Sequence, residues 1–171
     1  MSNARKLANL LGTSTTVPSS KLSLVTADMP SGSIIQVQHL SPTTQMNNFT
    51  NNSWVDATDF SINITPTSSS NKFYITSSAG CLHNNNQYIG YRIYRDGATV
   101  VQQNWSYHNR NEAWNGCSQM ALSAVDAPAT TSQVNYKIQV FSSQNAGQFY
   151  FNYGGSGSTM KAGFTVMEIA G

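Results

Sequence analysis

Apolar and polar residues alternate along most of the chain after residue 30. The segment 58–65 places phenylalanine or isoleucine at every second position, with polar residues between them, and 134–141 and 147–153 repeat the period. Successive side chains of a β-strand point to opposite faces, so a period of two predicts strands with one buried face. Most of the chain is therefore expected to form half-buried strands.

We expect eight or nine strands, with no helix between them. Asp96-Gly97 separates two of these strands, and both residue types accept the positive φ values of a tight hairpin turn. Many short strands at short spacing are typical of an antiparallel β-sandwich or jelly roll. The fold class is therefore predicted to be all-β. The predicted strands are 33–41, 58–65, 72–80, 88–95, 98–103, 116–125, 134–141, 147–153 and 158–169.

The first 30 residues follow a different pattern. Apolar residues in 3–11 recur at helical spacing, and Gly12 is a typical helix end. A helix of about ten residues is marginal in water, so an ordered one must lie against another surface. A linker rich in serine and threonine follows at 13–20. We expect residues 1–30 to form a short helical attachment arm and residues 31–171 to form one jelly-roll knob.

Charged residues are scarce and unevenly distributed. Only 9% of residues are charged, against about 25% in an average domain. Residues 1–21 contain three bases and no acid, whereas the remainder contains six bases and seven acids. A basic arm suits an acidic docking surface, but a sequence pI of about 8.6 is too weak for a nucleic-acid footprint. We expect no nucleic-acid partner.

Membrane and secretory signals are missing from the sequence. No run of about 20 apolar residues is present, and residues 3–11 are too short and polar for a secretory signal. We therefore expect no membrane partner and synthesis in a host cytoplasm. Cys81 and Cys117 do not make a disulfide framework; two buried thiols are favoured, and whether they pair is left open.

Motifs for catalysis, metals and cofactors are also missing. The three histidines lack metal-site or hydrolase spacing, and no phosphate-binding or dinucleotide motif occurs. Asp56 and Asp59 are close in sequence, but near a strand start such acids are more often turn and cap groups than a glycosidase pair. We expect no enzyme activity, catalytic residues, cofactor or metal.

Residues 104–115 are the most distinctive stretch because they mix aromatic rings with amide side chains. Trp, Tyr and Arg give large contact areas at low entropic cost, as in carbohydrate-binding and protein-binding surfaces. The same rings also pack long connections or subunit interfaces, which is the more common use. The candidate receptor or partner residues are Trp105, Tyr107, His108, Arg110 and Trp114.

Several segments resemble short structural proteins of tailed phages, especially those of marine and cyanobacterial hosts. They are SNARKLANLLG, DMPSGSIIQVQ, FSINITPTSSSNKFYI, YRIYRDG and FTVMEIAG, and the similarity spans nearly the whole chain. Proteins of this type are tail-fibre-like, head-fibre or capsid-decorating. The resemblance implies a jelly-roll knob similar to tumour-necrosis-factor and C1q heads, commonly a homotrimer, on the outer surface of a virion.

We therefore expect a capsid-decorating, cement or head-fibre-like protein. The sequence contains no heptads, collagen-like repeats or β-helix repeats, so it holds no fibrous shaft. In this hypothesis the arm attaches the knob to the major capsid protein, with basic residues pairing with acidic groups and leucines lying in grooves. The alternatives are a short tail-fibre or tail-tip adhesin that binds host glycan, and a depolymerising enzyme, which would require an acid pair in a cleft. The candidate attachment residues are Arg5, Lys6, Leu7, Leu10 and Leu11.

Overall fold

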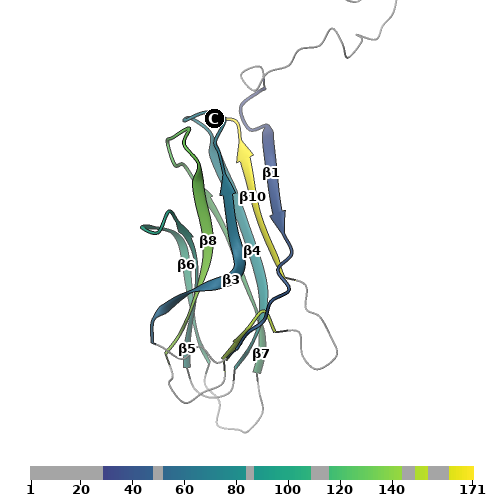
Figure 1. The fold of residues 1–171 in the computed structure, drawn as a ribbon, viewed down its shortest axis with the longest axis vertical. Helices are drawn as coiled ribbons and strands as arrows, with labels where there is room; N and C mark the ends of the chain where they lie inside the picture. Colours follow the sequence, from purple (N-terminus) through teal and green to yellow (C-terminus); the bar gives the residue numbers. More distant parts are fainter. Residues whose placement is uncertain (1–28, 48–51, 84–86, 109–115, 144–148, 154–161) are drawn as a thin grey trace, which may run out of the picture. The chain divides into compact units, whose positions relative to one another are not determined.

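The computed structural model describes residues 29–47, 52–83, 87–108, 116–143, 149–153 and 162–171. Within these ranges the chain forms ten strands and no helix. The strands make two antiparallel sheets, so the predicted all-β sandwich is confirmed (Figure 1). Residues 31–171 make up one compact unit. The helix expected at 3–11 lies outside the described residues.

Two sheets face each other across the core. We call the larger one sheet I and the four-stranded one sheet II. Sheet I contains β1 (Ile34–Leu40), β2 (Met46–Asn47), β4 (Lys72–His83), β7 (Gly116–Asp126), β9 (Phe149–Phe151) and β10 (Gly163–Ile169). Sheet II contains β3 (Trp54–Ile64), β5 (Gln87–Arg95), β6 (Thr99–His108) and β8 (Val134–Ser142).

The strand order is that of a jelly roll. Sheet I runs β1-β10-β4-β7, with β9 also paired to β4 and β2 paired to β9, and sheet II runs β3-β8-β5-β6. Without the short β2 and β9, the long strands follow the order first-eighth-third-sixth in one sheet and second-seventh-fourth-fifth in the other. This is the double Greek key of eight strands that defines the jelly roll.

All nine predicted strands are present, with shifted ends. The two-residue β2 was not predicted, β3 begins at Trp54, and β6 continues to His108. The Asp96-Gly97 turn is confirmed: the φ angles are 51° and 70°, and the Ala98 amide donates to the Arg95 carbonyl at 3.1 Å. Glycine and aspartate at these positions thus allow β5 to turn back into β6.

The core lies between the sheets and is formed by the alternating apolar positions. On β8 every second residue from Val134 to Ser142 is buried. Phenylalanine rings from both sheets meet in the middle, with the centroids of Phe60 and Phe151 5.2 Å apart. The alternation predicted from the sequence therefore matches the buried face. Side chains with no exposed surface include Phe60, Phe73, Ile75, Ile89, Ile93, Tyr136, Ile138, Val140, Phe151, Phe164 and Val166.

Polar contacts also join the two sheets. The hydroxyl groups of Tyr91 on β5 and Ser77 on β4 lie 2.5 Å apart inside the core. At the end of β7, the Asp126 carboxylate accepts hydrogen bonds from Tyr136 on β8, at 2.6 Å, and from Arg95 on β5. Buried polar groups need such partners, and these contacts fix how sheet I sits on sheet II.

Candidate functional site

Three aromatic rings meet on the outer face of sheet II. Trp54 on β3, Phe141 on β8 and Trp105 on β6 have ring centroids between 5.0 and 5.6 Å apart. They share one row because Trp54 pairs with Phe141, and Gly90 of β5 pairs with both Phe141 and Trp105. We call Trp54, Gly90, Trp105 and Phe141 the aromatic cluster.

Gly90 makes this arrangement possible. A Cβ atom at this position would lie 2.6 Å from the Trp54 ring and 3.0 Å from the Trp105 ring. Such distances are well inside van der Waals contact. The rings therefore close over the backbone of β5 because residue 90 has no side chain. Trp105 still keeps 45% of its surface exposed.

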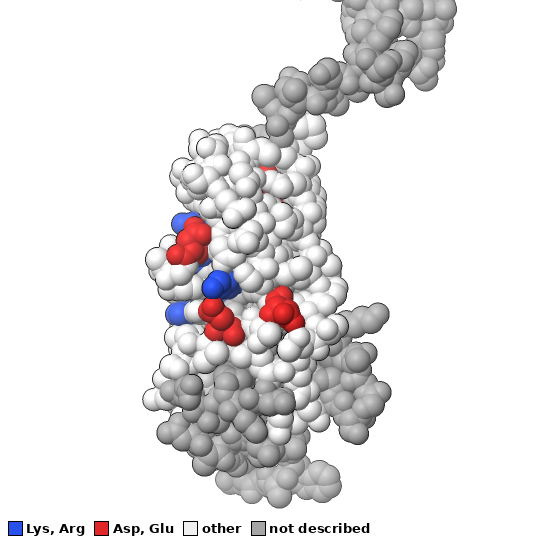
Figure 2. All heavy atoms as spheres, viewed as in Figure 1, with Lys and Arg blue, Asp and Glu red and all other residues white. Residues whose placement is uncertain are grey.

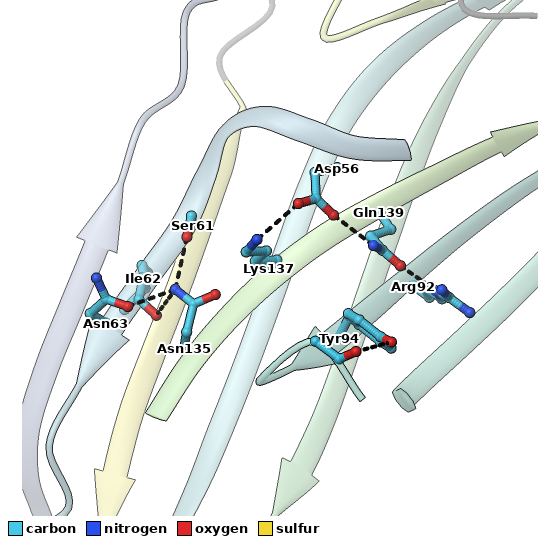
Figure 3. Close-up of polar contacts among 10 residues, drawn as sticks. Asp56, Ser61, Ile62, Asn63, Arg92, Tyr94, Asn135, Lys137 and Gln139 are labelled. Carbon is cyan, nitrogen blue, oxygen red and sulfur yellow. Dashed lines mark hydrogen bonds and ion pairs between the residues drawn. The ribbon is translucent and has the colours of Figure 1, made fainter. Parts of the chain in front are cut away.

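The next row of side chains on the outer face of sheet II is polar, and hydrogen bonds join its members. Lys137 donates to Asp56 at 2.8 Å, and Gln139 donates to the other Asp56 oxygen at 2.6 Å. The Nε of Arg92 in turn donates to Gln139 at 2.8 Å, so the chain of hydrogen bonds ends at Arg92 (Figure 3). Burial raises the pKa of Asp56, but the hydrogen bonds from Lys137 and Gln139 outweigh it and the net shift is downward. Asp56 is thus ionised in this row at neutral pH.

Aromatic rings hold the guanidinium of Arg92. Its central carbon lies 4.2 Å from the Trp54 ring centroid and 4.6 Å from that of Tyr94. Cation–π contacts of this kind fix the plane of the guanidinium. Charged side chains form a small group over the face shown in Figure 2, and most of the other described residues visible on that face are uncharged.

The outer face of sheet I is different, because an exposed apolar row crosses it. Val37 of β1 pairs with Met167 of β10, Met167 with Tyr74 of β4, and Tyr74 with Val125 of β7. Val37, Tyr74 and Val125 are 51%, 36% and 60% exposed. The row contains no charged side chain. We call Val37, Met167, Tyr74 and Val125 the apolar row, and Ile34, which is 57% exposed, pairs with Ile169 beside it.

The predicted receptor residues are only partly covered by the structure. Trp105 stands on strand β6 and belongs to the aromatic cluster. Tyr107 and His108 also lie in β6, so the first part of the expected loop is strand. The side chains of these two residues lie outside the described part of the chain. The same holds for Arg110 and Trp114 and for the attachment residues Arg5, Lys6, Leu7, Leu10 and Leu11.

Several residues around Trp105 were missed by the sequence analysis. Trp54, Arg92 and Phe141 occupy outward positions of three other strands, and nothing in their sequence spacing links them to Trp105. The only signal was their alternation with buried neighbours, which places each on an outer face but does not say which neighbour it meets. The register of sheet II brings them together.

The described residues show no acid pair or metal centre. Asp56 is engaged by Lys137 and Gln139, whereas Asp59, with φ of 65°, accepts a hydrogen bond from Thr44. No group of three metal-binding side chains occurs in the described ranges. Cys81 is buried in β4, and the pairing question stays open because the Cys117 side chain is not among those described.

The described residues contain no apolar helix that could span a bilayer.

The chain is similar to solved viral structures but matches no protein-family model. No curated protein matches it either. Among solved structures it is similar to the VP2 subviral particle of infectious bursal disease virus, with TM-score 0.39 and 14% identity over 80% of this chain and 38% of that chain. The structure of the Gx strain of this virus matches with TM-score 0.40 and 13% identity over 81% and 38%. The chain thus spans less than two fifths of those proteins, and likeness at this level carries no argument about function.

Proposed function

We propose that this chain is a non-enzymatic structural protein of a phage virion, a jelly-roll knob that decorates the capsid as a homotrimer. The resemblance of its sequence to short phage structural proteins supports the virion assignment. The jelly-roll strand order is the one that this resemblance implies. The observation that supports association of several copies is the apolar row on sheet I.

The apolar row is suited to contact with further copies of the same chain. Large exposed apolar patches on soluble proteins mark interaction surfaces. A row without charges that lies along a three-fold axis can bring three copies together with no like-charge repulsion. Sheet II is less suited to this contact, because its outer face carries the ionised Asp56, Arg92 and Lys137. The trimeric state follows from the resemblance.

Attachment is assigned to the N-terminal arm. Arg5 and Lys6 would pair with acidic groups of the major capsid protein, and Leu7, Leu10 and Leu11 would lie in grooves between its subunits. Three arms on one trimer raise the overall affinity, although each arm binds weakly. The expected location is the outer surface of the virion.

Assembly is tested by native mass spectrometry of the full chain. We expect a trimer for the wild type and a monomer for Tyr74→Glu, because the variant places a charge in the middle of the apolar row. Tyr88→Glu is the matched control, since Tyr88 is 55% exposed on the outward side of β5 in sheet II. A monomeric wild type at micromolar concentration would rule out the trimer. A trimeric Tyr74→Glu variant would rule out this surface.

Attachment is tested by deletion of residues 1–12. The shortened protein should keep its β-rich circular dichroism spectrum and its trimeric mass, but should no longer sediment with capsids that lack the decorating protein. Full decoration by the shortened protein would show that the arm is not the attachment device.

A second candidate function is a tail-tip adhesin that binds host glycan. The observation in its favour is the aromatic cluster, with Trp105 exposed beside polar side chains. Binding of the labelled protein to host cells separates the two functions. An adhesin should lose this binding in Trp105→Ala, whereas a decorating protein should bind capsids equally well with or without the substitution.

A further inference from the structure

We propose that the outer face of sheet II binds an acidic sugar, with the carboxylate of the sugar on Arg92 and its ring on Trp105. The inference rests on the second candidate function, for which it names the ligand class. It is independent of the capsid-attachment proposal. The site combines the aromatic cluster with the polar row of Asp56, Arg92, Lys137 and Gln139.

Arg92 is the anchor of this site. Its guanidinium is stacked against Trp54 and Tyr94 and tied through Nε to Gln139. Among the described residues its two terminal amino groups donate no hydrogen bond. A planar guanidinium donates two parallel hydrogen bonds to a carboxylate. Because the rings already hold it in place, little side-chain entropy is lost on binding.

Trp105 supplies the surface for the sugar ring. It is 45% exposed, and its ring centroid lies 5.1 Å from that of Trp54. Arg92 lies 4.2 Å from the centroid of the same Trp54 ring. Both contact the Trp54 ring, and Trp105 pairs in register with Gly90, two residues before Arg92 on β5, so the anchor and the stacking surface lie on neighbouring strands. The apolar face of a pyranose packs on an indole, while its hydroxyl groups stay at the rim.

The surrounding polar groups suit a hydroxylated ligand with one negative charge. Arg92 and Lys137 carry two positive charges and Asp56 one negative charge, which leaves a net charge of +1 on the site. The Asp56 side chain is 50% exposed, so it can accept a hydrogen bond from a sugar hydroxyl. Gln103 on β6 is exposed and pairs with Arg92 in register, which adds an amide on the other side. A neutral sugar offers the Arg92 amino groups only uncharged hydroxyl acceptors, whose hydrogen bonds are weaker than those of a carboxylate.

The ligand class is tested with one matched pair of probes. The first is an oligomer of glucuronic acid, and the second is the same oligomer after reduction of its carboxyl groups to alcohols. Binding to the full chain is followed by tryptophan fluorescence and by isothermal titration. We expect the reduced oligomer to bind at least about tenfold more weakly, which is the loss of one charge-assisted hydrogen bond. Added salt should weaken binding of the acidic oligomer only.

Three variants locate the site. Arg92→Lys keeps the charge but loses the planar pair of donors, and Trp105→Ala removes the stacking surface. Both should weaken binding of the acidic oligomer by about tenfold or more. Ser123→Ala is the control and should bind like the wild type, because Ser123 is exposed on β7 of sheet I and lies outside the apolar row. Circular dichroism and thermal melting establish that each variant is folded, and the oligomer pair tests the ligand class without any substitution.

The outcomes separate this inference from the functions proposed above. No binding of the acidic oligomer, or wild-type binding by Arg92→Lys, overturns it and leaves capsid decoration untouched. Equal binding of the two oligomers, with loss in Trp105→Ala, overturns the acidic class but supports glycan binding at the aromatic cluster. Binding of only the acidic oligomer, lost in both variants, supports the site as proposed.

Discussion

Glu168 of β10 is more deeply buried than any other carboxylate that the structure describes. It is 0% exposed, yet it forms no ion pair among the described residues. Instead its Oε1 accepts hydrogen bonds from the backbone N–H of Thr67 at 2.6 Å, the Thr67 hydroxyl at 2.9 Å and the side-chain amide of Asn71 at 2.7 Å. Its Oε2 accepts from Gln36 of β1 at 2.6 Å. The charge thus joins β1, β10 and the connection between β3 and β4.

Glu168→Gln tests how much this cluster stabilises the fold. A hydrogen bond to a charged group contributes about 1.5–3 kcal/mol and one between neutral groups about 0.5–1.5 kcal/mol. The variant turns the bonds to Oε1 into neutral ones, and its new amide group faces the donating amide of Gln36. An amide costs less to desolvate than a carboxylate, which offsets part of the loss. We expect the free energy of unfolding to fall by about 2–4 kcal/mol at pH 7.

The difference between wild type and variant should depend on pH. Burial raises the pKa of Glu168, but the hydrogen bonds from Asn71, Gln36 and Thr67 outweigh it, so the net shift is downward from 4.5. A lowered pKa in the folded state stabilises the protein above pH 4.5 and stops doing so as the pH falls through the folded value. The difference in free energy of unfolding between the wild type and Glu168→Gln should therefore become smaller below pH 4.5.

Urea unfolding at pH 7 and pH 3, followed by tryptophan fluorescence at one fixed protein concentration, measures this gap. Asp56→Asn is the matched control, because the Asp56 side chain is 50% exposed and surface ion pairs contribute only about 0–1 kcal/mol. A Glu168→Gln gap below about 1 kcal/mol at pH 7, or one of equal size at both pH values, would refute the reasoning.

Three further substitutions probe other parts of the fold. Gly90→Ala should lower the free energy of unfolding by about 1–3 kcal/mol and shift the tryptophan emission spectrum, because the added methyl group displaces Trp54; an unchanged spectrum would contradict the close contact. Tyr136→Phe removes the hydrogen bond to Asp126 and should lower the free energy of unfolding by about 1.5–3 kcal/mol in urea. An unfolding free energy equal to that of the wild type would show that this hydrogen bond does not stabilise the fold. Phe164→Ala leaves a cavity between the sheets and should cost about 3–5 kcal/mol, and a calorimetric melting temperature equal to that of the wild type would argue against its central position.

The strands were predictable where alternation is regular and not where it is interrupted. β8 alternates without exception, and its predicted range is almost the observed one. In β3 two exposed residues, Thr58 and Asp59, follow each other, and Asp59 has a positive φ of 65°. The register against β8 shifts at the same place. Counting every second residue back from Ile64 therefore fails there, which is why the earlier part of β3 was missed.

The extent of β6 was misjudged for a different reason. Asn104, Trp105 and Ser106 are all exposed, so they show no period of two. Their strand conformation comes from pairing with β5, in which Ile89 is buried and Gly90 leaves room for Trp105. Pairing with a neighbour can thus extend a strand where its own sequence gives no signal.

Where alternation is regular, the sequence by itself determined which residues face the core, and it also determined where the chain turns. Side-chain direction in a strand follows position in the chain alone, and the Asp96-Gly97 turn needs only local backbone conformations. The tertiary structure decided which outward residues share a row: Trp54 meets Trp105 on one face, and Val37 and Val125 lie at the two ends of one row on the other. Strand order and register are set by packing between distant segments, and a local period of two contains no information about them.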